Sequence, residues 1–130
     1  MIKMTTKNKI QRLEKKLISC LSDLLQISFM IRGSYKKSYC RCGKSTCWCS
    51  KDKKRKGHPS HRISWTKNSI SKTKAIPRED VEWIIEMTSN YRKYRTLRTE
   101  LRKLNQELNV FLDDLEEEVI KKTEKLKNYF

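Results

Sequence analysis

Four cysteines lie within ten residues of this chain, and two histidines follow them within twelve more. They are Cys40, Cys42, Cys47, Cys49, His58 and His61. Thiolates and imidazoles at this density are typical of a tetrahedral zinc site. The spacing is not that of a C₂H₂ finger. The segment therefore predicts a zinc centre, but not the base recognition that C₂H₂ fingers perform.

The preferred ligand set is three thiolates and one imidazole: Cys42, Cys47, Cys49 and His58. The loop between the first two cysteines contains Gly43 and can fold back, so that both sulfurs face one metal ion. Cys47 and Cys49 alternate around Trp48, and an extended chain would place both sulfurs on one side. His58 follows after eight intervening residues and can complete the tetrahedron.

Two other residues compete for places in this set. Cys40 would give a cramped site of four cysteines, and His61 could replace His58. Free buried thiols, a disulfide or a redox pair are further interpretations of the cluster. The fifth cysteine, Cys20, falls in an apolar helical stripe and is expected to be a small core residue.

The charge of the chain is concentrated around the cysteines. The formal net charge is +16, and residues 34–76 hold thirteen Lys and Arg side chains against one acidic residue, Asp52. A solvated charge run is the simplest interpretation, but its overlap with a metal site favours a surface that binds nucleic-acid phosphates. The candidate binding residues are Lys44, Trp48, Lys51, Lys53, Lys54, Arg55, Lys56, Arg62, Lys67, Lys72, Lys74, Arg92, Arg95 and Arg98.

Apolar residues at steps of three and four predict two helices. The first is expected from Thr5 or Thr6 to Arg32, with Gly33 ending it. The second is expected from Pro77, whose acidic first turn suits a helix start, through to Phe130. A helix of about 50 residues would extend about 75 Å, so it needs a partner. The first helix can cover about half of it, and a second subunit is expected to cover the rest.

Residues between the helices predict a β-hairpin. Ile63 and Trp65 would share one face of its first strand, Asn68-Ser69 would form the turn, and residues 70–76 would form the second strand. The predicted fold is therefore mainly α with a small zinc-stabilised hairpin insert, the two long helices packing as an antiparallel or oligomeric coiled-coil bundle. The expected segments are residues 1–33, 34–76 and 77–130.

The joint pattern resembles an uncharacterised prokaryotic family of small basic proteins. The resemblance rests on an R-G-S motif, an R-C-G-K-x-x-C-x-C run, a Gly-His-Pro turn, the hairpin and an N-Y-R-K-Y-R stretch, at residues 32–34, 41–49, 57–59, 63–76 and 90–95. It implies that Cys42, Cys47, Cys49 and His58 are the shared cluster, with Cys40 and His61 as local features. It implies no established activity, only an association with mobile-element genes.

No catalytic constellation is visible. The sequence lacks a Gly-rich phosphate loop and any acidic pair inside the basic segment, so an enzyme is not expected. No apolar run approaches the roughly 18 residues of a membrane span, and the N-terminus lacks the features of a signal peptide. We expect a cytoplasmic, oligomeric, zinc-containing protein that binds nucleic acid, with DNA favoured slightly over RNA. The alternative is a coiled-coil adaptor that binds a partner protein.

Overall fold

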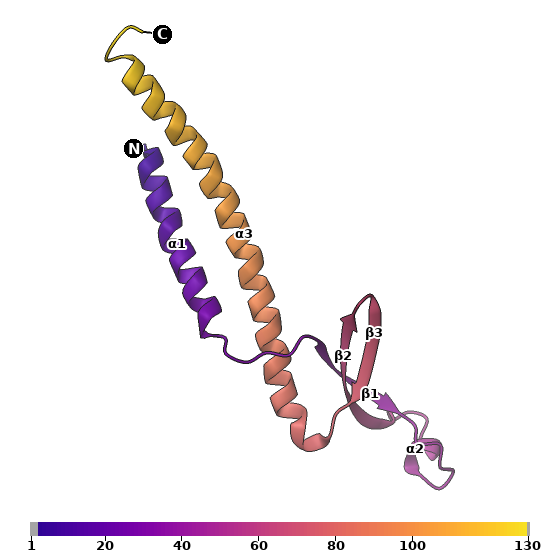
Figure 1. Cartoon of the computed structure of the whole chain (residues 1–130). Coiled ribbons are helices and arrows are strands. Elements are labelled where there is room, and N and C mark those ends of the chain that lie inside the picture. The colour runs from indigo at the N-terminus through magenta and orange to yellow at the C-terminus, as the bar shows by residue number, and fades with distance from the viewer. Residues whose placement is uncertain (1–2, 130) are drawn as a thin grey trace. The chain divides into compact units, whose positions relative to one another are not determined.

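The computed structural model describes residues 3–129 and is mainly helical, with one small antiparallel sheet. The elements follow in the order α1 (Thr6–Gln26), β1 (Ser34–Cys40), α2 (Trp48–Lys51), β2 (His58–Lys67), β3 (Ile70–Ala75), the 3₁₀ helix η1 (Arg78–Asp80) and α3 (Val81–Glu124) (Figure 1). The described chain forms two compact units. One contains residues 3–28 and 94–129, and the other contains residues 29–93.

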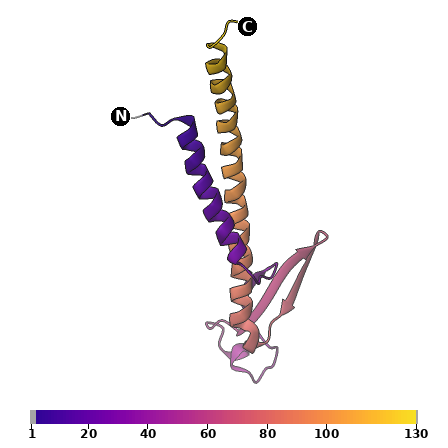
Figure 2. The ribbon, with the colours of Figure 1, turned by 60° about the vertical axis from the view of Figure 1, so that its left-hand side comes forward.

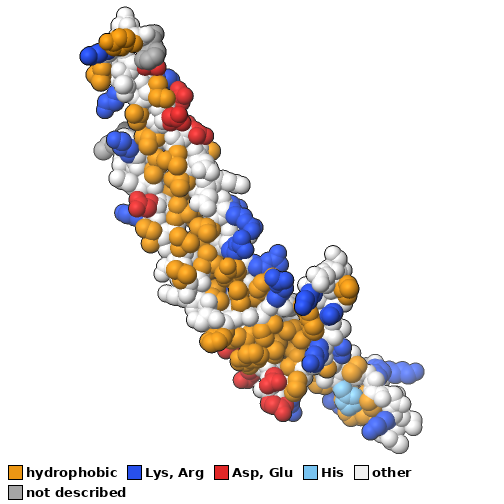
Figure 3. Space-filling model, in the orientation of Figure 1, with side chains coloured by type: hydrophobic (Ala, Val, Ile, Leu, Met, Phe, Trp, Pro, Cys, Tyr) orange, Lys and Arg blue, Asp and Glu red, His pale blue; other side chains and the backbone are white. Residues whose placement is uncertain are grey.

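In the first unit, α1 runs antiparallel beside the C-terminal part of α3 (Figures 1 and 2). The Thr6 hydroxyl donates to Glu118 at 2.5 Å near one end of the pair, and the Cys20 thiol donates to the Leu97 carbonyl at 3.3 Å near the other. The core residues recur at steps of three and four on both helices, and Figure 3 shows a hydrophobic stripe along them. They are Leu13, Leu17, Cys20, Leu24, Leu97, Leu101, Leu104, Leu108 and Phe111.

Cys20 is a core residue, as its position in the apolar stripe predicts. Its side chain is buried against the helix pair. Burial, followed by the charges of Glu100 and Asp23, raises the pKa of its thiol. A thiol in this environment stays protonated and packs as a small apolar group.

The start of α1 agrees with the prediction, but its end does not. The Thr5 side chain caps the helix by accepting from the Asn8 amide at 3.2 Å. The helix ends at Gln26, so the extension to Arg32 is wrong. Residues 27–31 leave the helix because their backbone has partners elsewhere. The Ile31 amide donates to the Met87 carbonyl at 3.1 Å, for example.

Gly33 comes directly before strand β1 instead of ending a helix. Its φ of +150° is disfavoured for other residues, and a Cβ there would lie 2.8 Å from the Ser64 carbonyl oxygen. The glycine therefore lets β1 begin close against β2, and its role as a helix stop is wrong.

The sheet of the second unit has the strand order β1-β2-β3, both pairs antiparallel. The predicted hairpin is confirmed. Asn68 and Ser69 both have positive φ, 51° and 64°, which suits a two-residue turn of the primed type. The register pairs Ile63 with Lys74 and Trp65 with Lys72. Strand β1 and the extension of β2 back to His58 were not expected from the sequence.

The second unit buries few side chains away from the cysteines. Ile63 of β2 and Met87 and Thr88 of α3 are buried. The Thr88 hydroxyl donates back to the Ile84 carbonyl at 2.8 Å, so its polar atom is satisfied inside the helix. A core this small leaves the fold of residues 34–76 dependent on backbone pairing and on the cysteine cluster.

The long C-terminal helix begins as predicted and ends earlier. Pro77 precedes η1, whose Glu79 and Asp80 supply the acidic first turn. Helix α3 then has 44 residues, about 66 Å at 1.5 Å each, and ends at Glu124. The predicted continuation beyond Glu124 is therefore wrong for residues 125–129, and Phe130 lies outside the described residues. No helix in the described range 3–129 is long and apolar enough to cross a membrane.

Candidate metal centre

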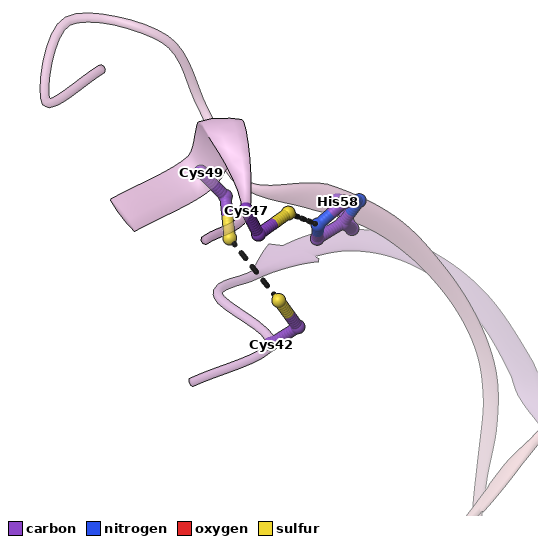
Figure 4. A group of neighbouring side chains, drawn as sticks. All are labelled: Cys42, Cys47, Cys49 and His58. Carbon is purple, nitrogen blue, oxygen red and sulfur yellow. Dashed lines mark hydrogen bonds between the residues drawn. The ribbon is translucent and has the colours of Figure 1, made fainter. Parts of the chain in front are cut away.

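Four side chains from three neighbouring parts of the second unit converge on one point (Figure 4). Cys42 lies in the loop after β1, Cys47 and Cys49 lie at the start of α2, and His58 is the first residue of β2. Their sulfur and imidazole nitrogen atoms all lie within 4.8 Å of one another. These are the four residues that the sequence prefers as ligands, and they lie close enough to hold a metal ion.

The distances suit a tetrahedron better than a disulfide. The Cys42 and Cys49 sulfurs are 3.5 Å apart, whereas a disulfide needs about 2.05 Å. The Cys47 sulfur lies 3.1 Å from Nε2 of His58. A tetrahedral zinc ion would give edges of about 3.8 Å between two sulfurs and about 3.5 Å between sulfur and nitrogen. Small adjustments would therefore bring all four atoms into a first coordination shell.

The loop from Cys42 to Cys47 turns sharply. Gly43 has a φ of +81°, and the Cys47 amide donates to the Lys44 carbonyl at 3.1 Å. Cys47 then caps α2, and the Ser50 hydroxyl donates to the carbonyls of Ser45 and Cys47. The prediction that Cys47 and Cys49 alternate along an extended chain is wrong. A single helical turn brings the two sulfurs together instead.

The basic loop that follows is folded around its one acidic residue, Asp52. Oδ1 of Asp52 accepts from the backbone amides of Lys54 and Arg55 at 3.1 and 3.3 Å. The Arg41 guanidinium donates to the carbonyls of Asp52 and Arg55. These bonds close the loop between α2 and β2, and so return the chain to the cluster at His58.

The thiols differ in how readily they lose a proton. The Lys44 backbone amide, followed by the side chains of Cys49 and Cys47, lowers the pKa of Cys42 to about 7. For Cys49, the Cys42 backbone amide favours the thiolate, but burial and the neighbouring thiols together raise the pKa. One thiolate therefore forms easily, and the buried one needs a nearby positive charge. A divalent cation supplies that charge and releases protons when it binds.

An aromatic ring contacts the histidine of the cluster, and a cation lies over that ring. The Trp48 ring centroid is 4.9 Å from that of His58, at an interplanar angle of 58°. The Arg55 guanidinium lies 4.5 Å from the Trp48 centroid. Trp48 thus helps to orient a candidate ligand, and its exposed fraction of 37% leaves part of the ring open.

The two alternate ligands lie outside the group. Cys40 is exposed on β1, opposite His58 in the register, and is not among the four converging residues. His61 is engaged elsewhere. Its Nδ1 is 2.5 Å from the Tyr35 hydroxyl, and the two rings stack with centroids 5.9 Å apart.

The structure separates the predicted nucleic-acid residues into several groups. Lys44, Trp48 and the basic residues from Lys51 to Lys56 belong to α2 and to the loops on either side of it, the same part of the chain as Cys47 and Cys49. Because side chains alternate along a strand, the register places Arg62 on one face of the sheet and Lys67, Lys72 and Lys74 on the other. Arg92 belongs to the second unit, whereas Arg95 and Arg98 belong to the first. No single surface is therefore established for the whole set.

Two basic residues of β1, Lys36 and Lys37, were missing from the predicted set. Lys37 lies over the Tyr39 ring at 5.6 Å from its centroid, and Lys56, which is in the predicted set, lies at 5.1 Å from the same centroid. Lys36 stands directly opposite Arg62. Tyr35, Lys37 and Tyr39 share one face of β1 because they lie two residues apart, so recognising residues 34–40 as a strand would have indicated these positions.

Replacing Gly57 should disrupt this centre without removing a ligand. A Cβ on this buried glycine would lie 2.3 Å from the Cys40 carbonyl oxygen and 2.6 Å from its carbon, both backbone atoms. We expect Gly57→Ala to displace His58 and to weaken Co²⁺ binding at least tenfold, measured from the absorption of the cobalt–thiolate complex. Lys56→Ala, an exposed neighbour, is the control and should bind as the parent does. Equal affinities for the two variants would contradict this account.

Comparison with known proteins gives one match. No curated protein and no solved structure matches the chain. A family model described as a domain of unknown function, DUF6788, matches residues 7–86. This range covers α1 from Lys7 onward, the whole sheet, the four converging residues and the first six residues of α3. Because the match covers more than half of the 130 residues, the chain belongs to the DUF6788 family.

Proposed function

We propose that this protein is a zinc-containing accessory protein that binds nucleic acid. The observation that carries the proposal is the position of the Cys₃His group inside the most basic segment of the chain. Asp52, the one acidic residue of residues 34–76, uses its carboxylate to accept from two backbone amides of the basic loop. The lysines around the cluster therefore have few local carboxylates to neutralise them.

The metal is proposed to be zinc with a structural role. Three thiolates and one imidazole form a complete tetrahedral set, and structural zinc sites use four protein ligands of this kind. Such a set leaves no coordination position for a substrate or a reactive water. This donor set supports a protein that is not an enzyme.

The basic loop is the proposed contact to phosphate. Lys51, Lys53, Lys54, Arg55 and Lys56 are all exposed, and the hydrogen bonds of Asp52 and Arg41 hold the loop in one shape. Lysines act as point charges on phosphates, and the open part of Trp48 can stack on a base. None of these contacts distinguishes DNA from RNA. We propose DNA only because the family that the sequence resembles is associated with mobile-element genes.

The zinc proposal predicts about one zinc ion per chain. Elemental analysis of Cys42→Ser, Cys47→Ser, Cys49→Ser and His58→Ala should each show loss of the ion. Loss of amide protection in the hairpin should accompany it, because ligand binding and folding are coupled in such sites. Cys40→Ser and His61→Ala are the controls and should keep the metal. Zinc retained in all four ligand variants would refute the assignment.

The nucleic-acid proposal predicts binding that falls steeply with salt. Neutralising about five phosphates would give a slope near −4.5 in a plot of log K against log salt for duplex DNA. Changing Lys51, Lys53, Lys54 and Lys56 together to Ala should reduce that slope by about 3.6. Changing Lys121, Lys122, Lys125 and Lys127 to Ala removes the same charge and should leave the slope unchanged.

Duplex DNA, single-stranded DNA and structured RNA should be compared in that titration. The nucleic acid that binds most tightly at the same salt concentration is the preferred ligand. Equal effects of the two lysine sets, or no binding of any of the three at low salt, would count against a nucleic-acid function and favour the adaptor.

The second candidate function is assembly through the helices. Ile18, Leu21 and Leu25 lie at steps of three and four on α1 and are 59, 44 and 83% exposed. The charges of α3 are self-complementary about Glu107. Arg98 lies nine residues before Glu107 and Glu116 lies nine residues after it, and the midpoint between Arg102 and Asp113 falls at nearly the same position. A second copy related by a two-fold axis would therefore place acidic residues opposite basic ones.

This assembly predicts a dimer at micromolar concentration by sedimentation. Reversing two charges, as Arg98→Glu with Arg102→Glu, should shift the protein toward monomer because like charges would then face each other. Adding Asp113→Lys and Glu116→Lys should restore the dimer by exchanging the signs. A compact monomer for the parent protein would exclude the dimer and most of the adaptor proposal.

A further inference from the structure

A cavity lies in the sheet unit, at the part of β2 that follows His58. Its volume is about 540 Å³, within the range of roughly 300–1,000 Å³ that is usual for small-ligand sites. The polar residues that line it are Lys37, Ser60, His61 and Arg78, and Pro59 and Ile76 contribute apolar surface. All of them belong to residues 29–93.

Backbone pairing brings the basic side chains of this cavity together. Lys37 of β1 and His61 of β2 are opposite each other in the register, so their side chains leave the same face of the sheet. The Ile76 amide donates to the His61 carbonyl at 2.9 Å and holds the segment after β3 beside β2. This bond places Arg78, two residues further on, at the edge of the cavity.

The cavity gathers positive charge without an acidic lining residue. Glu79 and Asp80 follow Arg78 in the chain, but neither lines the cavity. Like charges held close together repel each other, and an anion bound between them removes that repulsion. Arginine is well suited to phosphate because its planar donors can bind two oxygens at once.

His61 is held in a fixed orientation. Its Nδ1 pairs with the Tyr35 hydroxyl at 2.5 Å and its ring stacks on that of Tyr35, so Nε2 is the ring nitrogen left for a ligand. This is the histidine that the metal cluster does not use.

We propose that this cavity binds a phosphate monoester of mononucleotide size. Lys37 and Arg78 neutralise the phosphate, His61 donates to one of its oxygens, and Pro59 and Ile76 cover the apolar part of the ligand. The site takes a single terminal phosphate group, in contrast to the repeated phosphodiesters proposed for the basic loop. It requires neither nucleic-acid binding by that loop nor any particular metal.

The test is a titration of the isotope-labelled, zinc-supplemented full chain, followed by amide NMR spectra. The probes are inorganic phosphate, adenosine 5′-monophosphate and adenosine. We expect saturable shifts at Lys37, His61, Ile76 and Arg78 with the monophosphate, weaker binding of inorganic phosphate and no binding of adenosine. Lys37→Gln and Arg78→Gln should each weaken the monophosphate about tenfold or more, as loss of a charged hydrogen bond predicts. Lys93→Gln, an exposed residue of the same unit that does not line the cavity, is the matched control and should have no effect.

Two further arms separate the sources of the phosphate. Oligonucleotides of one sequence with a 5′-phosphate or a 5′-hydroxyl should differ in affinity if the cavity receives a nucleic-acid end. If they do not differ while the free monophosphate binds, a free nucleotide is the ligand. Absence of saturable shifts with the monophosphate, equal binding of adenosine, or an equal loss in Lys93→Gln would overturn the proposal. The spectra of each variant also report whether it is folded, so an unfolded variant cannot be taken for a binding defect.

Discussion

The antiparallel pairing of β1 with β2 is the constraint on which the second unit depends. It ends where Cys40 stands opposite His58, and Gly57 lies so close to Cys40 that no side chain fits between them. The pairing brings His58 back to thiols that lie up to 16 positions earlier in the chain. It also places Lys37 opposite His61 at the cavity. Both candidate sites are therefore products of one strand register.

The helices could be predicted because their signal is local and periodic. Steps of three and four identified the residues that pack between α1 and α3, including Cys20. The end of α1 could not be predicted in the same way. Residues Ile27 and Ile31 continue the apolar period, but tertiary partners of the backbone around them take precedence over the helix. Gly33 was misread because a glycine after a helix and a glycine at a close strand contact look alike in sequence.

The four converging residues were also predictable as a group, because thiols and imidazoles close in sequence have few other uses at that density. The conformation between them was not, since the turn at Gly43 and the helical turn after Cys47 satisfy the same spacing as an extended chain. The distribution of the lysines depends on strand register, and a shift of one residue would exchange the two faces. Lys72 and Arg62 are therefore on opposite faces of the sheet although both belong to the basic segment of residues 34–76.

The range of the family match divides the packing of α1 in this chain. The matched residues end at 86, whereas the core partners of α1 on α3 begin at Leu97. The helix inside the matched range is therefore covered here by residues outside that range. A fragment of this chain that ended at residue 86 would leave the apolar face of α1 open to water, so the matched residues do not by themselves form the packed helix pair.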